Sequence, residues 1–332
     1  MVRKGWMLLL VAIVFFSILI GYIVTSLERD NKPKIVVVLR TLNLEYWQMV
    51  RSGAEQAFHD FDIDGKVIAP NSELQVKEQI TILKNALEEN PDALIVAPNQ
   101  PSAVIPVLKK YKTNNIPVMI VDTETDWNGQ TAFIGTDPYT LGRKSGELLA
   151  SMLQPRDQVA LIGETLFTSR ESVRMRSARE TLQDAGVEIV TEQVVDTERE
   201  KIRSVMGHIL KQFPDIKGVF AANDEIALYS LEEIKEKGFQ IPVVGTDGIS
   251  DIMEDIEEGG LDATVAQNPY DMGYLSVERA LKAIKGEPGQ KRIDSGVDLI
   301  TQDNAKQRLD FMKDIRINAA SRKSNGSYWW EE

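Results

Sequence analysis

Short apolar runs alternate with amphipathic stretches along most of the chain. The apolar runs have the length and composition of buried β-strands and lie at 34–39, 66–69, 93–97, 117–121, 159–162, 218–221 and 242–245. Between them, Val76, Ile80, Leu83 and Leu87 are separated by four, three and four residues, which predicts a helix over 75–89. Strands and helices in alternation predict an α/β fold whose parallel sheets are covered by helices on both faces.

The alternating pattern occurs twice. Residues 90–96 resemble 213–219 at an offset of 123, and residues 116–122 resemble 241–247 at an offset of 125. An offset of this size is the length of a domain and far exceeds a solenoid repeat. The sequence therefore predicts two similar lobes, each a parallel sheet flanked by helices.

Polar and aromatic residues follow the apolar runs in both halves. They lie at 40–47, 98–100 and 122–124 in the first half and at 163–174, 222–225 and 246–248 in the second. In open parallel sheets, ligands bind beyond the carboxyl ends of the strands. We therefore expect both sets to face one cleft between the lobes.

The chemistry of these strand ends suits a sugar. Two carboxylates, a guanidinium and an amide are present, at Asp122, Arg174, Asn223 and Asp247. Such groups can grip adjacent hydroxyls, and ionised partners strengthen the hydrogen bonds. Tyr46 and Trp47 offer flat apolar faces for the C–H side of a sugar ring. Because the opposed charges are expected to compensate one another, the pattern favours a neutral polyol over an anion.

Composition excludes several other functions. The 332-residue chain has a formal net charge of −12, which argues against nucleic acid as a partner. It has no cysteine, so disulfides, thiolate chemistry and lipid attachment at a cysteine are excluded. No phosphate-binding loop or activated nucleophile is visible in the sequence, so we expect neither an enzyme nor a bound cofactor or metal.

The N-terminus has the pattern of a membrane anchor. Arg3 and Lys4 precede Trp6 to Val24, a run of 19 residues without a charge. This is close to the ~20 residues that span a bilayer, and the basic flank is expected to stay in the cytoplasm. We expect an uncleaved single-pass anchor in the cell membrane with the lobes outside the cytoplasm. A cleaved signal peptide is the alternative, with 24–26 as a weak cleavage site.

Several motifs resemble those of one protein family. They lie at 41–43, 116–122, 174–176, 222–227, 244–248 and 263–267. With this order and spacing, residues 33–304 resemble a type I periplasmic sugar-binding protein of the ribose/galactose-binding class, the extracytoplasmic receptors of ABC importers. The resemblance implies the periplasmic-binding-protein-like I fold.

The resemblance also implies roles for individual residues. Tyr46 and Trp47 would sandwich the sugar together with a group from the other lobe. Five further residues would hydrogen-bond its hydroxyls, and these are Asp122, Arg174, Asn223, Asp247 and Gln267. Where the family pattern expects a small polar residue, an asparagine and an arginine, this chain has Arg40, Leu44 and Thr123. We therefore do not predict ribose, and Arg40 is a further candidate for ligand binding.

Two residues at the start of the first predicted helix have competing interpretations. Helical spacing of Trp47 with Val50, Ala54 and Ala57 predicts a core residue, whereas the resemblance implies a residue that lines the site. Asn43 is expected to be the N-cap of this helix.

The domain organisation follows from the same resemblance. Residues 1–32 are expected to hold a cytoplasmic stub, the anchor and a linker, and 305–332 a C-terminal tail that is flexible over 319–327. The N-terminal lobe is expected to comprise 33–136 with 268–296, and the C-terminal lobe 137–267 with 297–304. The chain would cross between the lobes near 136–137, 267–268 and 296–297.

Three functions are compatible with these features. The first is a membrane-anchored receptor that presents a neutral monosaccharide to an ABC permease. The second is a sugar-sensing subunit that signals to a membrane histidine kinase, which a permanent anchor and the missing lipid-attachment cysteine favour. The third and remote alternative is a regulator of the LacI type, although an apolar run stands where its DNA-binding helices would be.

Overall fold

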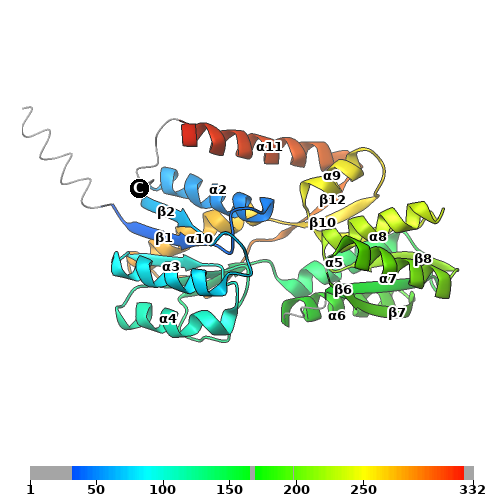
Figure 1. The fold of residues 1–332 in the computed structure, drawn as a ribbon, viewed down its shortest axis with the longest axis horizontal. Helices are drawn as coiled ribbons and strands as arrows, with labels where there is room; N and C mark the ends of the chain where they lie inside the picture. Colours follow the sequence, from blue (N-terminus) through cyan, green and yellow to red (C-terminus); the bar gives the residue numbers. More distant parts are fainter. Residues whose placement is uncertain (1–31, 165–168, 197, 325–332) are drawn as a thin grey trace, which may run out of the picture.

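The protein folds into two α/β lobes joined side by side (Figure 1). This computed structural model describes residues 32–164, 169–196 and 198–324. The strands are β1 (Lys34–Val38), β2 (Asp64–Ile68), β3 (Ala93–Val96), β4 (Val118–Val121), β5 (Ala132–Gly135), β6 (Gln158–Glu164), β7 (Glu188–Val195), β8 (Ile216–Ala221), β9 (Val243–Asp247), β10 (Ala263–Gln267), β11 (Arg292–Asp294) and β12 (Val297–Thr301). The helices are α2 (Glu45–Asp60), α3 (Val76–Glu88), α4 (Pro101–Thr113), α5 (Pro138–Ser151), α6 (Ser169–Asp184), α7 (Arg199–Gln212), α8 (Asp224–Glu236), α9 (Ser250–Glu257), α10 (Pro269–Ile284) and α11 (Gln302–Ser324).

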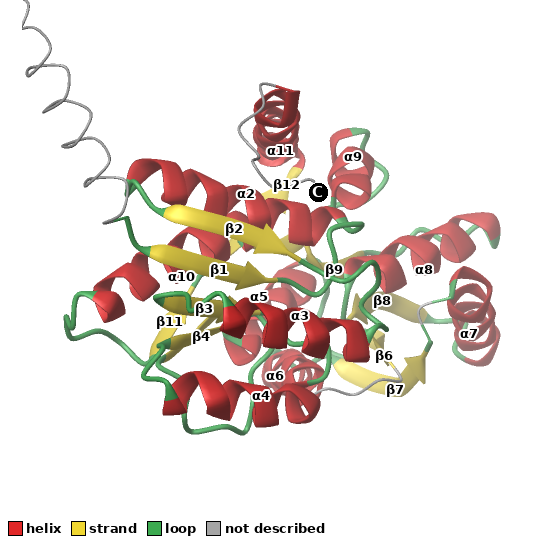
Figure 2. Ribbon diagram, turned by 60° about the vertical axis from the view of Figure 1, so that its left-hand side comes forward, coloured by secondary structure: helices red, strands yellow, loops and turns green. Residues whose placement is uncertain are grey.

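The N lobe is built on a six-stranded sheet of order β11-β5-β4-β3-β1-β2, and every pairing in it is parallel. Its central strands are buried on both faces, which explains their continuous apolar sequence. On β1, Ile35 and Val37 face α2 and α10, whereas Val36 and Val38 face α3 and α4. Figure 2 shows these helices covering the two sides of the sheet.

The C lobe repeats this arrangement in a sheet of order β12-β10-β9-β8-β6-β7. Among the described strand pairs of this sheet, the one between β10 and the edge strand β12 is antiparallel and the others are parallel. Helices α5 and α6 pack on one face, and α7, α8, α9 and α11 on the other. In each sheet the chain order reverses beside the first strand, so each lobe has a topological switch point, the usual place for a ligand in such sheets.

The chain passes between the two sheets three times. It crosses after β5 at 136–137, between β10 and α10 at Asn268, and between β11 and β12 at 295–296. The lobes also touch beside the crossings, because Ser250 at the start of α9 donates its hydroxyl to Glu45 Oε1 of α2 at 2.6 Å.

The structure confirms the predicted two-lobed α/β fold and adds elements that the apolar pattern did not mark. Five strands, β5, β7, β10, β11 and β12, were not predicted. Polar residues interrupt the apolar pattern in β7, β10, β11 and β12, and β5 is a four-residue strand that ends on a glycine.

The prediction of a flexible tail over 319–327 is wrong for its first residues. Residues 302–324 form α11, which packs against α9 and also contacts α2 of the other lobe. The prediction of flexibility from 319 onward relied on small polar residues, but helix α11 extends through Ser324.

The predicted anchor cannot be compared with the structure. Trp6 to Val24 lie outside the described residues. Within the described ranges, no helix has the length and apolar character needed to cross a membrane.

Candidate functional site

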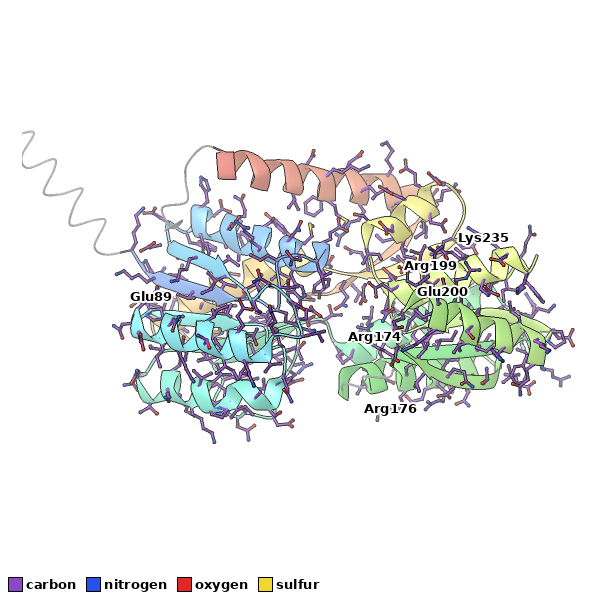
Figure 3. All side chains as sticks on the ribbon, viewed as in Figure 1. Glu89, Arg174, Arg176, Arg199, Glu200 and Lys235 are labelled. Atoms are coloured by element: carbon purple, nitrogen blue, oxygen red, sulfur yellow. The ribbon has the colours of Figure 1, made fainter. Side chains whose placement is uncertain are left out.

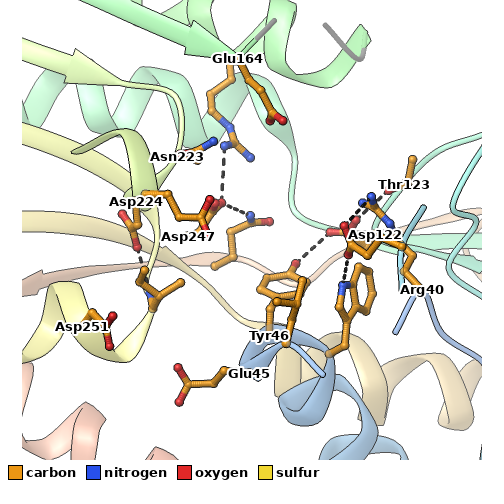
Figure 4. Close-up of a pocket in the computed structure, with 17 residues that line it drawn as sticks. Arg40, Glu45, Tyr46, Asp122, Thr123, Glu164, Asn223, Asp224, Asp247 and Asp251 are labelled. Carbon is orange, nitrogen blue, oxygen red and sulfur yellow. Dashed lines mark hydrogen bonds and ion pairs between the residues drawn. The ribbon is translucent and has the colours of Figure 1, made fainter. Parts of the chain in front are cut away.

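The carboxyl ends of the strands in both lobes line one cavity of about 370 Å³ (Figure 4). This volume falls in the range typical of small-molecule sites. The lining residues are Arg40, Leu44, Glu45, Tyr46, Trp47, Glu73, Asp122, Thr123, Glu164, Arg174, Asn223, Asp224, Glu225, Asp247, Ile249, Asp251 and Gln267.

Two aromatic side chains from the first turn of α2 form part of the N-lobe wall. The Tyr46 and Trp47 rings contact each other edge to face, with centroids 5.1 Å apart. Trp47 Nε1 donates to Glu73 Oε1 at 2.5 Å, and the other oxygen of Glu73 accepts from Arg40 at 2.9 Å. The Arg40 guanidinium also lies 5.7 Å from the centre of the Trp47 ring. Glu73 therefore holds Arg40 and Trp47 in place at the edge of the cavity.

Asp122 lies at the carboxyl end of β4 in the same wall. Its Oδ1 accepts from the Tyr46 hydroxyl at 2.8 Å and its Oδ2 accepts from Thr123 Oγ1 at 2.8 Å. The side chain is buried, and its backbone has a φ of 62°. Such a positive φ is uncommon for a residue with a Cβ atom and occurs often at binding sites.

The C-lobe wall contains a linked group of three polar side chains. Asp247 Oδ1, at the end of β9, accepts from Gln267 Nε2 at 2.5 Å and lies 3.5 Å from Arg174 Nη1. Arg174 lies at the edge of the C lobe that faces the N lobe (Figure 3), where it also donates to Thr246 Oγ1 at 2.8 Å and to the carbonyl of Ala222. Asp247 has a φ of 118°, so both equivalent aspartates have positive φ.

The start of α8 supplies a cap and a buried carboxyl group. Asn223 is the N-cap, and its Oδ1 accepts from the amide of Ile226 at 2.9 Å. Asp224 is fully buried and accepts from Ile249 N at 2.9 Å and from Thr264 Oγ1 at 3.1 Å. Burial and, next, the nearby carboxylate of Asp247 raise the pKa of Asp224. Asp224 thus fixes the loop after β9 by accepting hydrogen bonds from its backbone amides, and this loop borders the cavity.

Acidic groups are frequent among the described residues of the lining. Eight of the lining residues carry a carboxyl group, and they are Glu45, Glu73, Asp122, Glu164, Asp224, Glu225, Asp247 and Asp251. Among the described lining residues, Arg40 and Arg174 carry a guanidinium group. The charge compensation expected from the sequence stays a prediction, because residues 165–168, which follow Glu164 of the lining, lie outside the described residues.

The structure brings all eight sequence-predicted residues to this cavity. They are Arg40, Tyr46, Trp47, Asp122, Arg174, Asn223, Asp247 and Gln267. Trp47 satisfies both interpretations, since it is 3% exposed within the N-lobe core and also borders the cavity. Their role as ligand contacts stays a prediction.

One of the sequence predictions for α2 is wrong. The helix begins at Glu45 with Leu44 in the N-cap position, and no side chain caps it. Asn43 instead donates its amide to the carbonyl of Asn71 at 2.6 Å. The local sequence alone did not reveal this, because the partner lies in the loop after β2.

A family comparison identifies the architecture. The family model described as a periplasmic binding protein domain matches residues 35–288. The chain belongs to the periplasmic binding protein family. The match spans both lobes and includes every residue that lines the cavity.

Two relatives in this family are similar to this chain over nearly their whole length. The ribose import binding protein RbsB of Bacillus subtilis (strain 168) is 29% identical over 274 residues, which cover 82% of this chain and 89% of that protein. The D-ribose/D-allose-binding protein of Pseudomonas aeruginosa is 28% identical and covers 82% of this chain and 90% of that protein.

One solved structure of a periplasmic solute binding protein has a fold similar to that of this protein. It is an ABC transporter periplasmic solute binding protein from Actinobacillus succinogenes 130z with bound D-allose, with a TM-score of 0.76 and 26% identity. The similarity covers 83% of this chain and 100% of that chain.

Nine of the described lining residues were not among the eight candidates, and Glu73, Glu164 and Glu225 are three of the acidic ones. Glu73 lies in the loop after β2, Glu164 is the last residue of β6, and Glu225 lies in the first turn of α8. Glu164 and Glu225 fall inside the strand-end groups noted in the sequence, so the position was visible although the residues were not chosen. Glu73 had no such signal, because the predicted strand before it ends four residues earlier.

Proposed function

We propose that this protein is an extracytoplasmic, membrane-anchored receptor that binds a monosaccharide between its lobes and presents it to an ABC sugar importer. The observation that carries the proposal is the cavity to which both lobes contribute. It combines hydrogen-bonding side chains from the strand ends with the rings of Tyr46 and Trp47. This combination suits a ligand with hydroxyls on its edge and C–H groups on its faces.

The proposed roles follow from the contacts in each wall. Tyr46 and Trp47 stack on the sugar ring, while Asp122, Arg174 and Asp247 hydrogen-bond its hydroxyls. Asn223 contributes its amide nitrogen, since its oxygen serves as a helix cap. Gln267 contributes its amide oxygen, since its nitrogen bonds Asp247. Arg40 acts at the edge, held by Glu73.

Closure of the lobes is the proposed mechanism. A ligand that contacts both walls binds the closed arrangement better than an open one, and this difference shifts the population toward closure. The three crossings between the sheets are the places where the backbone would turn. The relatives named for ribose and allose support a sugar as the ligand class.

A thermal-shift screen tests this function. The full-length protein in detergent is mixed with D-ribose, D-xylose, D-glucose, D-galactose, D-allose and the amino derivatives of the hexoses. A sugar at one hundred times its Kd stabilises the folded protein by about 2.7 kcal/mol and raises the unfolding temperature. If no monosaccharide raises it, the proposed function is wrong.

Sensing is the second candidate function, and two sequence features favour it. The run from Trp6 to Val24 lacks a strong cleavage site, and the chain has no cysteine for a lipid anchor. A permanently anchored lobe pair suits a subunit that reports sugar to a membrane histidine kinase. Deletion of the gene distinguishes the transport function from the sensing function. If the protein serves transport, the deletion is expected to abolish sugar uptake. If it serves sensing, uptake is expected to remain while sugar-induced transcription is lost.

A further inference from the structure

One polar group predicted at a strand end does not line the cavity but is connected to it. Residues 98–100 follow β3, and none of them is among the described residues of the lining. Asn99 instead donates its side-chain Nδ2 to the carbonyl of Glu73 at 2.8 Å. Glu73 in turn accepts from Trp47 Nε1 and from Arg40. Asn99 therefore lies one residue away from two residues that line the cavity.

A fully buried glutamine of α3 holds Asn99. Gln79 is 0% exposed, and its Oε1 accepts from the backbone amide of Asn99 at 2.9 Å. Its Nε2 donates to the carbonyls of Leu39 at 3.1 Å and Ala97 at 2.9 Å, which follow the paired strands β1 and β3. Rotation of this amide would leave several buried groups unpaired, so its position is well defined. Gln79 therefore ties Asn99 to the carboxyl ends of both strands.

The side-chain amide of Asn99 has one favourable orientation. Its Nδ2 faces the carbonyls of Glu73 and Ser72 at 2.8 and 3.4 Å, whereas its buried Oδ1 has no hydrogen-bond partner among the described residues. In the reversed orientation the amide oxygen would face both carbonyl oxygens and repel them. The Asn99 side chain therefore fixes the loop at 69–75, which carries Glu73 between β2 and α3.

We propose that Gln79 and Asn99 are positioning residues for ligand binding. They act through Glu73, whose carboxylate holds Arg40 and Trp47 at the cavity. This inference rests on the proposed function and adds two residues outside the described lining. The loop that carries Glu73 is partly exposed, so its position depends on such anchors. A carboxylate that is fixed before a sugar arrives lowers the conformational entropy lost on binding.

Substitution of Asn99 tests the inference. Asn99→Leu removes the donor to the carbonyl of Glu73 but keeps the size of the side chain and the charge of the protein. The loop retains a second anchor, because Asn43 donates to the carbonyl of Asn71 at 2.6 Å, so we expect the variant to fold. Asn99→Ala removes the same donor without a bulky side chain and is made beside it. Asn85→Leu, at an exposed position of α3 outside the cavity, is the control.

The first measurement requires no sugar. It is a nuclear magnetic resonance spectrum of the full-length protein in detergent with isotope-labelled tryptophan. Trp47→Phe identifies the Trp47 indole N–H resonance among those of the five tryptophans. Both Asn99 variants are expected to shift this resonance, because Glu73 moves relative to Trp47 Nε1. Asn85→Leu is expected to leave it in place.

The second measurement is titration calorimetry with the sugar that stabilises the parent protein most among D-ribose, D-xylose, D-glucose, D-galactose and D-allose. Asn99→Leu is expected to weaken binding by about tenfold, the scale of one buried carbonyl that loses its donor. Because Asn99 acts through Glu73, the same exchange in a Glu73→Ala background is expected to weaken binding by about twofold or less. A tenfold loss in both backgrounds would show a structural role independent of Glu73 and overturn the inference.

Two further outcomes overturn the inference in different ways. If the Trp47 resonance is unshifted in both Asn99 variants, or if both bind within about twofold of the parent protein, the positioning role is wrong while the proposed function stands. If none of these sugars binds the parent protein, the proposed function fails and the inference fails with it.

Discussion

Backbone strain marks the same residue position in both lobes. Asp122 follows β4 with a φ of 62°, and Asp247 ends β9 with a φ of 118°. A residue with a Cβ atom adopts these angles at a cost of roughly 1–3 kcal/mol, so a glycine would be the less strained choice. Each aspartate instead directs a carboxylate that lines the cavity. The strain is therefore evidence for a shared role of the two positions.

Removing the Asp247 carboxylate is expected to abolish ligand binding. Asp247→Ala takes away an acceptor that lines the cavity and leaves Gln267 Nε2 without its partner. We expect the affinity for the most stabilising sugar of the thermal screen to fall by about a hundredfold or more, the scale of two lost charged hydrogen bonds. Titration calorimetry measures this loss.

The control for this variant is Asp262→Ala, which removes an exposed aspartate outside the cavity. It is expected to bind like the parent protein. Both variants are expected to unfold cooperatively in a thermal scan, because Asp247→Ala also removes a carboxylate that repels Asp224. Binding by Asp247→Ala within about twofold of the parent would remove Asp247 from the site.

At the scale of elements, α2 depends on an unusually close contact with α10. A Cβ atom on Gly53 would lie 1.9 Å from the carbonyl oxygen of Tyr270, and one on Gly273 would lie 2.0 Å from that of Val50. The two glycines let the helix backbones approach each other. Because α2 carries Tyr46 and Trp47, this contact also sets the position of the aromatic wall.

Filling the contact is expected to destabilise the N lobe. Gly53→Ala forces the two backbones apart and is expected to lower the free energy of unfolding by about 1–3 kcal/mol. Urea unfolding followed by tryptophan fluorescence measures the change. Gly207→Ala is the matched control, since a Cβ there meets only the flexible end of Glu233, at 3.1 Å.

Gly207→Ala is expected to be neutral or stabilising by up to about 1 kcal/mol, because alanine favours a helix interior over glycine. If Gly53→Ala shifts the urea midpoint no more than Gly207→Ala does, the close contact is not important for stability.

At the scale of the whole molecule, α11 connects the C lobe to a crossing between the lobes. Arg308 Nη2 donates to the carbonyl of Gln267 at 3.0 Å and to Asn268 Oδ1 at 2.9 Å. Arg308 Nη1 also lies 3.4 Å from Asp298 on β12. One arginine thus bonds two neighbouring strands at the point where the chain leaves the C lobe. It also holds Asn268, the residue next to Gln267, which lines the cavity.

Replacing Arg308 is expected to loosen this crossing. Arg308→Met keeps the apolar stem of the side chain but removes the guanidinium group that donates to the carbonyl of Gln267. We expect a loss of about 1–3 kcal/mol in the free energy of unfolding. Lys306→Met on the same helix removes only an exposed pair with Asp310 and is expected to change it by about 0.5 kcal/mol or less. Equal urea midpoints for the two variants would show that Arg308 does not hold the crossing.

The sequence by itself determined the two-lobed α/β architecture and most candidate residues of the site, whereas Gln267 came from the family resemblance alone. Apolar periodicity, the internal repeat and the polar residues at strand ends can all be read along the chain. A residue that follows an apolar run in the sequence also lies at the end of that strand in the fold. A parallel sheet places those ends at one edge, so the cleft followed from the order of elements.

Only the tertiary structure decided that Glu73 joins the cavity, which residue Asn43 bonds and where α11 runs. Each depends on residues distant in the chain, such as Glu73 beside Arg40 or Arg308 beside Gln267. Side-chain pairing of this kind leaves no periodic signal, because it is set by how the lobes and their helices pack together.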